Sequence, residues 1–374
     1  MIDLLIDRRT LPKGINFKAA GYETGQEIDI TISRFVTEYR AEVLEDSQGH
    51  RFTATFPEAL KRPVQYGNNI KAHSVYMSQF QLVPVDRVRD HFADLIGVPV
   101  SAGSICNFNL QAYNGLARFE DWAKQQLIAS PVMHADETGI SIGGKRHWLH
   151  NVSSTSLTLL YPHEKRGRET MDMFGVIPSF QGVLCHDHWK PYYLYDCLHS
   201  LCNAHHLREL ECAFEQDQQQ WAKAMQTCLL DINAAVDDSG GVLNVEDAKR
   251  WREHYRKLLA DAEHECPPPV PTPNKRGRVK RSKARNLLER LVNYETDVLR
   301  FMTEKHVPFT NNQGENDLRM TKVQQKISDC FRSMDGAKTF CRIRSYLSTC
   351  RKQGLTASKA LSYLFDGKDP DFMR

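Results

Sequence analysis

The chain lacks several features that would assign it to a broad class of protein. No apolar run approaches the roughly 18–20 residues that a helix needs to cross a bilayer, and the first residues, with Asp3, Asp7 and Arg8, lack the pattern of a signal peptide. The ten cysteines include no Cys-x-x-Cys pair, which argues against a disulfide scaffold and against a simple zinc ribbon. We therefore expect a cytoplasmic protein with reduced cysteines and no membrane partner.

A strong excess of either charge is also absent, because the formal net charge is +3 over 374 residues. Hydrophobic residues make up 41% of the chain and charged residues 25%, which is typical of a soluble globular protein. A chain of this length has enough material for two or three domains with buried cores.

Two aspartates follow predicted β-strands. Asp136 lies near the end of a short apolar-leaning run, residues 132–138, which leads to a Gly-Gly turn and so predicts a hairpin. Asp187 directly follows the apolar run 182–186, which is typical of a buried parallel strand.

A third carboxylate belongs to a predicted helix. Residues 310–312, Thr-Asn-Asn, are a helix-start signal, so Glu315 should lie in the first turn, with Arg319 one turn further on. Three such acids can converge and hold two Mg²⁺ ions, or Mn²⁺ as a substitute, because Mg²⁺ prefers oxygen ligands and usually shares its coordination sphere with substrate phosphates. A metal pair of this kind supports in-line phosphoryl transfer on nucleic acid.

The sequence around these acids resembles a known family. Residues 134–150, 182–210 and 307–354 look like the core of bacterial DDE-class transposases of the insertion sequence sixty-six family, and the likeness extends from about residue 20 to the end. The resemblance implies a ribonuclease H-like fold, with Asp136, Asp187 and Glu315 as the catalytic, metal-binding acids.

The resemblance also implies partners. They are DNA, both as element ends and as target, a homo-oligomer on that DNA, and accessory proteins of the same element. Fuller members carry an amino-terminal extension with a coiled-coil-like segment and a cysteine-rich zinc motif, which this sequence lacks. We therefore expect end recognition and assembly to be incomplete in this chain, and a DNA-binding relic or repressor without cleavage activity remains an alternative.

Two stretches are rich in positive charge. No acid lies between Glu265 and Glu289, and a proline-rich run there is followed by seven cations that predict a mobile DNA-binding arm. These cations are Lys275, Arg276, Arg278, Lys280, Arg281, Lys283 and Arg285. Removal of residues 274–285 should weaken DNA binding and lower its salt dependence.

The second basic stretch runs from Arg319 to Lys352 and has nine Lys or Arg residues against two acids. In it, Arg319, Lys322 and Lys326 are predicted to contact DNA, while solvated helix faces or a structural ion pair between Arg319 and Glu315 remain the alternatives.

Histidines and tyrosines near Asp187 suggest a rival reading. His186 and His188 could belong to a zinc hydrolase, or to a His-x-His nuclease with Tyr192 or Tyr193 as its nucleophile. On a strand, however, the two histidines would point away from Asp187, so the three side chains would not meet at one ion.

The remaining sequence divides into helical and strand-like parts. Residues 26–56 alternate as in a small antiparallel sheet, and residues 85–97 and 102–127 predict two helices, the second capped by Ser101. This pair fits a helix-turn-helix, although a plain helical hairpin fits equally well, and Ser104 and Asn107 would be its DNA-reading residues. A long helical stretch between the second and third acids predicts an inserted domain, which opens with a Cys-x-x-His pair, Cys202 and His205, too few ligands for a closed zinc site.

We therefore expect an α/β protein in which a ribonuclease H-like mixed sheet with flanking helices is interrupted by a mainly helical insertion, preceded by a β segment and a helix-turn-helix-like region. The predicted boundaries are 1–60 for the β-rich segment, 61–130 for the helical DNA-binding region, 131–200 and 305–352 for the two parts of the core, 201–304 for the insertion with its basic arm, and 353–374 for a carboxy-terminal tail.

Overall fold

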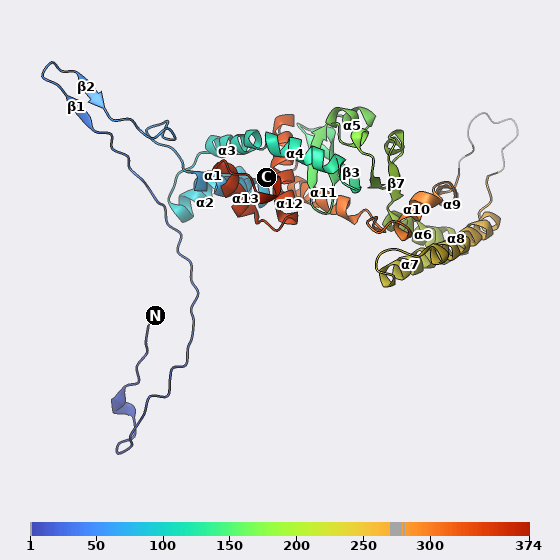
Figure 1. Cartoon of the computed structure of the whole chain (residues 1–374), viewed down its shortest axis with the longest axis horizontal. Coiled ribbons are helices and arrows are strands. Elements are labelled where there is room, and N and C mark those ends of the chain that lie inside the picture. Colours follow the sequence, from blue (N-terminus) through green and yellow to red (C-terminus); the bar gives the residue numbers. More distant parts are fainter. Residues whose placement is uncertain (1, 270–278, 280) are drawn as a thin grey trace.

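The computed structural model describes residues 2–269, 279 and 281–374. Residues 2–62 extend away from the body of the molecule (Figure 1), and within them only β1 (Val43–Glu45) and β2 (Arg51–Thr53) pair, in antiparallel fashion. The turn between them is held by the Asp46 carboxylate, which accepts hydrogen bonds from the backbone N–H groups of Gln48 and His50. The predicted sheet over residues 26–56 is thus confirmed only for these two strands, because the apolar side chains before them have no surface to pack on and stay exposed.

Four helices precede the sheet: α1 (Asn68–Val75), α2 (Val85–His91), α3 (Ala102–Gly115) and α4 (Ala117–Ile128). Short π-helical turns at Tyr76–Phe80 and Phe92–Ile96 extend the first two. Gly97 ends the second of these turns in a left-handed conformation, and Ser101 caps α3 by accepting a hydrogen bond from the Ser104 N–H, as predicted. The single helix predicted over residues 102–127 is wrong at Leu116, where the backbone leaves the helical region and separates α3 from α4.

A five-stranded mixed sheet forms the centre. Its strands are β3 (Val132–Ile142), β4 (Lys145–Ser153), β5 (Thr158–His163), β6 (Val183–His186) and β7 (Leu198–Leu201), in the order β5-β4-β3-β6-β7. The first three strands pair in antiparallel fashion, and β3, β6 and β7 pair in parallel. The predicted α/β class is confirmed.

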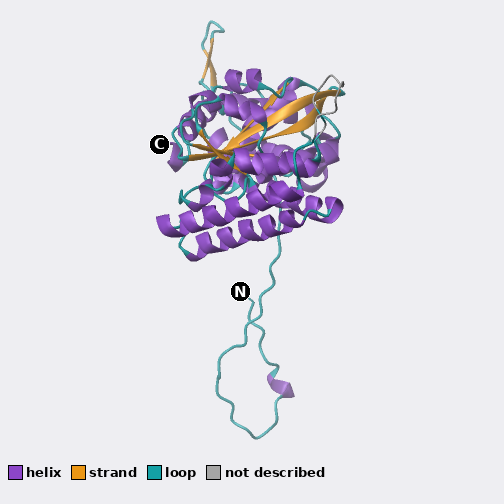
Figure 2. Cartoon of the chain, turned by 90° about the vertical axis from the view of Figure 1, so that its right-hand side faces the viewer, coloured by secondary structure: helices purple, strands orange, loops and turns teal. Residues whose placement is uncertain are grey.

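The remaining helices follow in two groups. Between strands lies α5 (Arg168–Phe174), and after β7 come α6 (Asn203–Asp217), α7 (Gln220–Asp238), α8 (Val245–Glu265), α9 (Lys283–Asn293) and α10 (Glu295–Val298). The chain then returns to the sheet with α11 (Asn312–Ser328), α12 (Met334–Lys352) and α13 (Ala357–Phe365). Figure 2 shows helices on both sides of the strands and the long helices of the first group as a separate layer.

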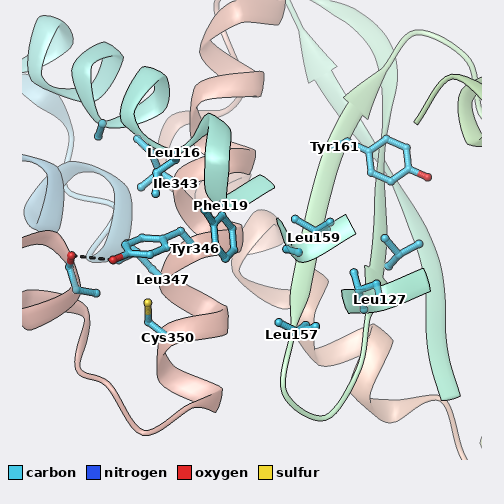
Figure 3. Close-up of a cluster of buried hydrophobic side chains, with 14 of the residues drawn as sticks. Leu116, Phe119, Leu127, Leu157, Leu159, Tyr161, Ile343, Tyr346, Leu347 and Cys350 are labelled. Carbon is cyan, nitrogen blue, oxygen red and sulfur yellow. Dashed lines mark hydrogen bonds between the residues drawn. The ribbon is translucent and has the colours of Figure 1, made fainter. Parts of the chain in front are cut away.

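Three hydrophobic clusters hold these elements together. The largest joins one face of the sheet to α3, α4, α12 and α13, and in it Tyr346 packs against Phe119 and donates a hydrogen bond to the Ala360 carbonyl at 3.0 Å (Figure 3). A second cluster joins β6 and β7 to helices α6–α9, and a third joins α11 and α12 to the other face of the β3–β4 hairpin. Among the described residues, no helix is both long and apolar enough to span a membrane.

Candidate active site

The pairing of β3 with β6 brings the two predicted aspartates together. The parallel register pairs His134 with Cys185, and each of these residues lies two positions before one of the aspartates. Neighbouring strands lie about 4.8 Å apart, and Asp187 is close enough for its charge to affect the pKa of Asp136. Asp136 lies in the middle of β3 rather than near its end, because β4 pairs with β3 as far as Ile142.

Asp187 begins the loop that follows β6. Its Oδ1 atom accepts a hydrogen bond from the Trp189 N–H at 3.0 Å, and His188 between them adopts a positive φ of 70°. This turn fixes the carboxylate just beyond the strand, next to Asp136.

Glu315 lies in the first turn of α11, as predicted. The residue before the helix, Asn311, does not cap it, and its buried side chain instead reaches β3. The Asn311 Nδ2 atom donates to the Ala135 carbonyl at 2.9 Å, and its Oδ1 atom lies 2.8 Å from His134 Nδ1. Asn311 therefore fastens the start of α11 to the strand that carries Asp136.

A glycine allows this close approach. A Cβ atom at Gly314 would lie 3.1 Å from the side chain of Asn311, and the Gly314 carbonyl accepts a hydrogen bond from Asn151 of β4 at 3.1 Å. The first turn of α11 is thereby held against both β3 and β4.

The result is a small pocket of about 220 Å³ that contains two of the three acids. Its walls include Asp136, His205, Glu315, Arg319 and Lys322. Burial raises the pKa of Asp136 to about 7, and the negative charges of Glu137, Asp187 and Glu315 add to this shift. A bound cation would relieve the part of this shift that comes from repulsion between the carboxylates.

The three acids do not form the tightest ligand set. Among the described residues, the one group of three possible ligand atoms within 4.8 Å of one another belongs to Cys202, His205 and Glu315. The Glu315 Oε1 atom lies 3.7 Å from His205 Nδ1 and 3.6 Å from an Arg208 nitrogen, so it faces both side chains of α6. Within the part of the chain that the structure describes, Glu315 Oε1 and His205 Nδ1 are both buried without a hydrogen-bond partner, which fits a site built to receive another group.

A comparison with protein families decides the relationship of this chain. The profile described as "Transposase IS66 family" matches residues 63–339, which is more than half of the sequence. The chain belongs to the IS66 family of transposases. A comparison with curated proteins found no match. The predicted family is confirmed, and membership implies a DNA-processing enzyme with DNA as its substrate.

The transposase carries three of its predicted DNA-binding cations on one side of α11. Arg319, Lys322 and Lys326 are exposed, and together with Glu315 they line a groove of about 490 Å³. Within the described residues Arg319 forms no ion pair with Glu315, whose side chain lies near His205 and the cation Arg208 instead. The structural ion pair considered for Arg319 is therefore wrong.

The rest of the second basic stretch is partly internal to the fold. Arg342 pairs with Glu120, Lys352 pairs with Asp317, and the buried Arg344 donates to the Phe80 carbonyl at 3.0 Å. These three side chains stabilise the packing of α12.

The cations of the basic arm predicted for the transposase also differ in their surroundings. Lys275, Arg276, Arg278 and Lys280 lie outside the described residues. Lys283 is exposed at the start of α9, whereas Arg281 pairs with Glu289.

Arg285 does not fit its predicted contact with DNA. It is buried and donates to Glu263, Glu289 and the Cys266 carbonyl. Removal of residues 274–285 would therefore also break the packing between α8 and α9.

The rival nuclease reading meets two structural objections. The Tyr192 hydroxyl is buried and donates to Glu137 at 2.6 Å, and the Tyr193 hydroxyl donates to Asp297 at 3.2 Å. His186 is buried against His199, at 3.1 Å between ring nitrogens, and burial holds its pKa well below the usual range for histidine. Both tyrosine hydroxyls are thus bound to carboxylates within the fold, and His186 with His188 belongs to no three-ligand group among the described residues.

The sequence analysis missed Glu137 and Arg166. The Glu137 side chain is 1% exposed and accepts hydrogen bonds from Tyr192 and from Arg166 in the loop before α5. An acid directly after Asp136 in a buried strand is the one signal in the sequence that points to it, since a buried carboxylate needs a partner.

Proposed function

We propose that this transposase cleaves DNA at the ends of an insertion sequence and joins the freed 3′-hydroxyl to target DNA. The observation that carries the proposal is that Asp136 and Glu315 line one pocket. The effect of the Asp187 charge on the pKa of Asp136 supports adding the third acid to this site. The strand order, three antiparallel strands followed by two parallel ones, supports a ribonuclease H-like core.

Asp136 and Asp187 would hold the metal ions, and Glu315 would complete the second site. Two Mg²⁺ ions, or Mn²⁺ in their place, would activate the attacking oxygen and stabilise the leaving one. The raised pKa of Asp136 and the unpartnered Oε1 atom of Glu315 support this fit.

The protein's own groups would hold the DNA. Arg319, Lys322 and Lys326 provide positive charge along the groove that leads from Glu315, where they would neutralise phosphates. Asn311 would act as a positioning residue, because it fixes the helix that carries Glu315. Asn107, exposed on α3, remains a candidate for base contact, whereas the Ser104 hydroxyl lies 3.0 Å from that of Ser101 in the helix cap.

The test is cleavage of DNA that carries the element's own ends. Asp136→Asn, Asp187→Asn and Glu315→Gln should each reduce Mg²⁺-dependent cleavage to background, with DNA binding retained. Asp196→Asn, which removes an exposed acid from the same loop region, is the matched control and should cleave like the native protein.

Cleavage above background by Asp187→Asn would defeat the assignment of the acids. Absence of cleavage by the native chain, together with sequence-specific binding of the ends, would instead identify a repressor or relic.

A further inference from the structure

Two arginines and two tryptophans form a continuous stack at the edge of the candidate active site. The guanidinium carbon of Arg146 lies 4.8 Å from the ring centre of Trp148, and that of Arg166 lies 4.8 Å from the same ring. Arg166 also lies 4.4 Å from the ring centre of Trp189. The four planar groups therefore alternate as Arg, Trp, Arg and Trp.

The stack is built onto the strands and loops that carry the two aspartates. Trp148 of β4 lies opposite Gly139 of β3, and the loop after β6 places Trp189 two residues beyond Asp187. Glu137, the neighbour of Asp136, anchors the central guanidinium through a 2.8 Å hydrogen bond from Arg166 Nε. One end of the stack is thus fixed beside the acids.

The backbone leaves room for the outer arginine. A Cβ atom at Gly139 would lie 3.4 Å from Arg146 Nε, so glycine at this position lets the guanidinium settle over β3 next to Trp148.

Packing and charge pairing do not account for the outer part of the stack. In the described part of the chain, Trp148 belongs to none of the three hydrophobic clusters, and Arg146 has no acidic partner. Arg146 is exposed, and Trp148 is only half-buried. A large indole and a free guanidinium are therefore presented together at the surface.

We propose that Arg146, Trp148, Arg166 and Trp189 form a stacking site for an unpaired nucleobase of the DNA substrate. Indole and guanidinium planes stack on the faces of bases, and a base within a duplex has both faces covered by its neighbours. The site would therefore prefer a frayed or single-stranded nucleotide next to the strand that the acids act on. This inference rests on the proposed function, since it concerns the DNA that Asp136 and Asp187 would process.

The test compares binding of single-stranded and duplex DNA without divalent metal, so that it does not depend on cleavage. Trp148→Leu and Trp189→Leu should each weaken binding of an oligothymidylate by about tenfold, which is the size of one lost stacking contact, because each indole supports a guanidinium of the site. Binding of a blunt duplex of equal length should change little. Trp251→Leu, which removes a half-buried tryptophan from α8, is the matched control and should leave both affinities unchanged.

A spectroscopic readout separates stacking from a structural role. One 2-aminopurine placed in the oligothymidylate should lose fluorescence on binding to the native protein, and Trp148→Leu should abolish this quenching while Trp148→Phe retains it. If Trp148→Leu does not fold, Arg146→Leu provides the same comparison, because Arg146 is exposed and has no acidic partner among the residues described. The proposal would be overturned if Trp148→Leu or Arg146→Leu lost equal affinity for single-stranded and duplex DNA. Unchanged 2-aminopurine quenching in a folded variant would also overturn it.

One variant distinguishes failure of the stacking proposal from failure of the proposed cleavage function. Asp187→Asn should still quench 2-aminopurine and prefer the single strand, whether or not the native protein cleaves DNA.

Discussion

Asn311 shows how one side chain can set the geometry of a site. Sequence reasoning placed it in a helix-start signal, and α11 does begin at the next residue. Its side chain, however, bonds to His134 and Ala135, and its N–H donates to Cys202 Sγ at 3.1 Å. Local pattern could not reveal these bonds, because their partners are remote in sequence. Glu315 was therefore predictable as a helix residue from local pattern, whereas its membership of one site with Asp136 was expected from the residue types and the family resemblance.

Asn311→Ala tests this positioning role. Loss of the buried bonds to β3 should lower the free energy of unfolding by about 1–3 kcal/mol. DNA cleavage should fall more than this destabilisation explains, because Glu315 loses its fixed distance from Asp136. Urea unfolding and cleavage by the same preparation would measure both effects.

Asn312→Ala is the control for that variant, since Asn312 is exposed at the first position of α11. Equal cleavage by the two variants under conditions where both are folded would show that Asn311 does not position the site.

At the scale of elements, α11 combines the third acid with a basic stripe. Glu315, Arg319, Lys322 and Lys326 recur at helical spacing, and the structure confirms that they line one groove. The strands that carry the aspartates were predictable from their apolar runs. The length of β3 was not predictable, because the strand continues past Asp136 only through its pairing with β4, which extends to Ile142. The break at Leu116 was missed for a similar reason, since helical periodicity continues through it.

Neutralisation of the stripe should change how DNA binding depends on salt. Replacement of Arg319, Lys322 and Lys326 by Ala should lower the slope of log affinity against log salt by about 2 to 3, since each phosphate contact contributes about 0.9. Lys359→Ala, an exposed cation on α13, should leave the slope unchanged. A slope that is also unchanged in the triple variant would exclude α11 from the DNA interface.

At the scale of the whole molecule, the three hydrophobic clusters share strands and helices, so the inserted helices are not packed independently. Val183, Cys185 and Leu201 of β6 and β7 lie in the same cluster as the buried residues of α7 and α8. The carboxy-terminal segment is likewise part of the body, because Ala360 and Leu361 of α13 are fully buried. The extended amino-terminal residues contribute little to these clusters.

Deletions at the two ends of the chain should therefore have very different effects on the melting temperature. Removal of residues 2–62 should shift the melting temperature by no more than about 2 °C, because this segment buries almost no apolar surface. Removal of residues 353–374 should prevent folding or lower the melting temperature by well over 5 °C, since it uncovers Tyr346 and its neighbours. Differential scanning calorimetry would measure both, and a large loss from the first deletion would contradict this description of the core.

The most direct test of the three-acid site is the anomalous diffraction signal of a crystal soaked in Mn²⁺. We predict manganese bound by Asp136 and Asp187 with Glu315 close by, whether or not DNA is present to complete the coordination. Manganese held by Cys202 and His205, with both aspartates left without metal even in a DNA complex, would contradict the proposed reaction centre.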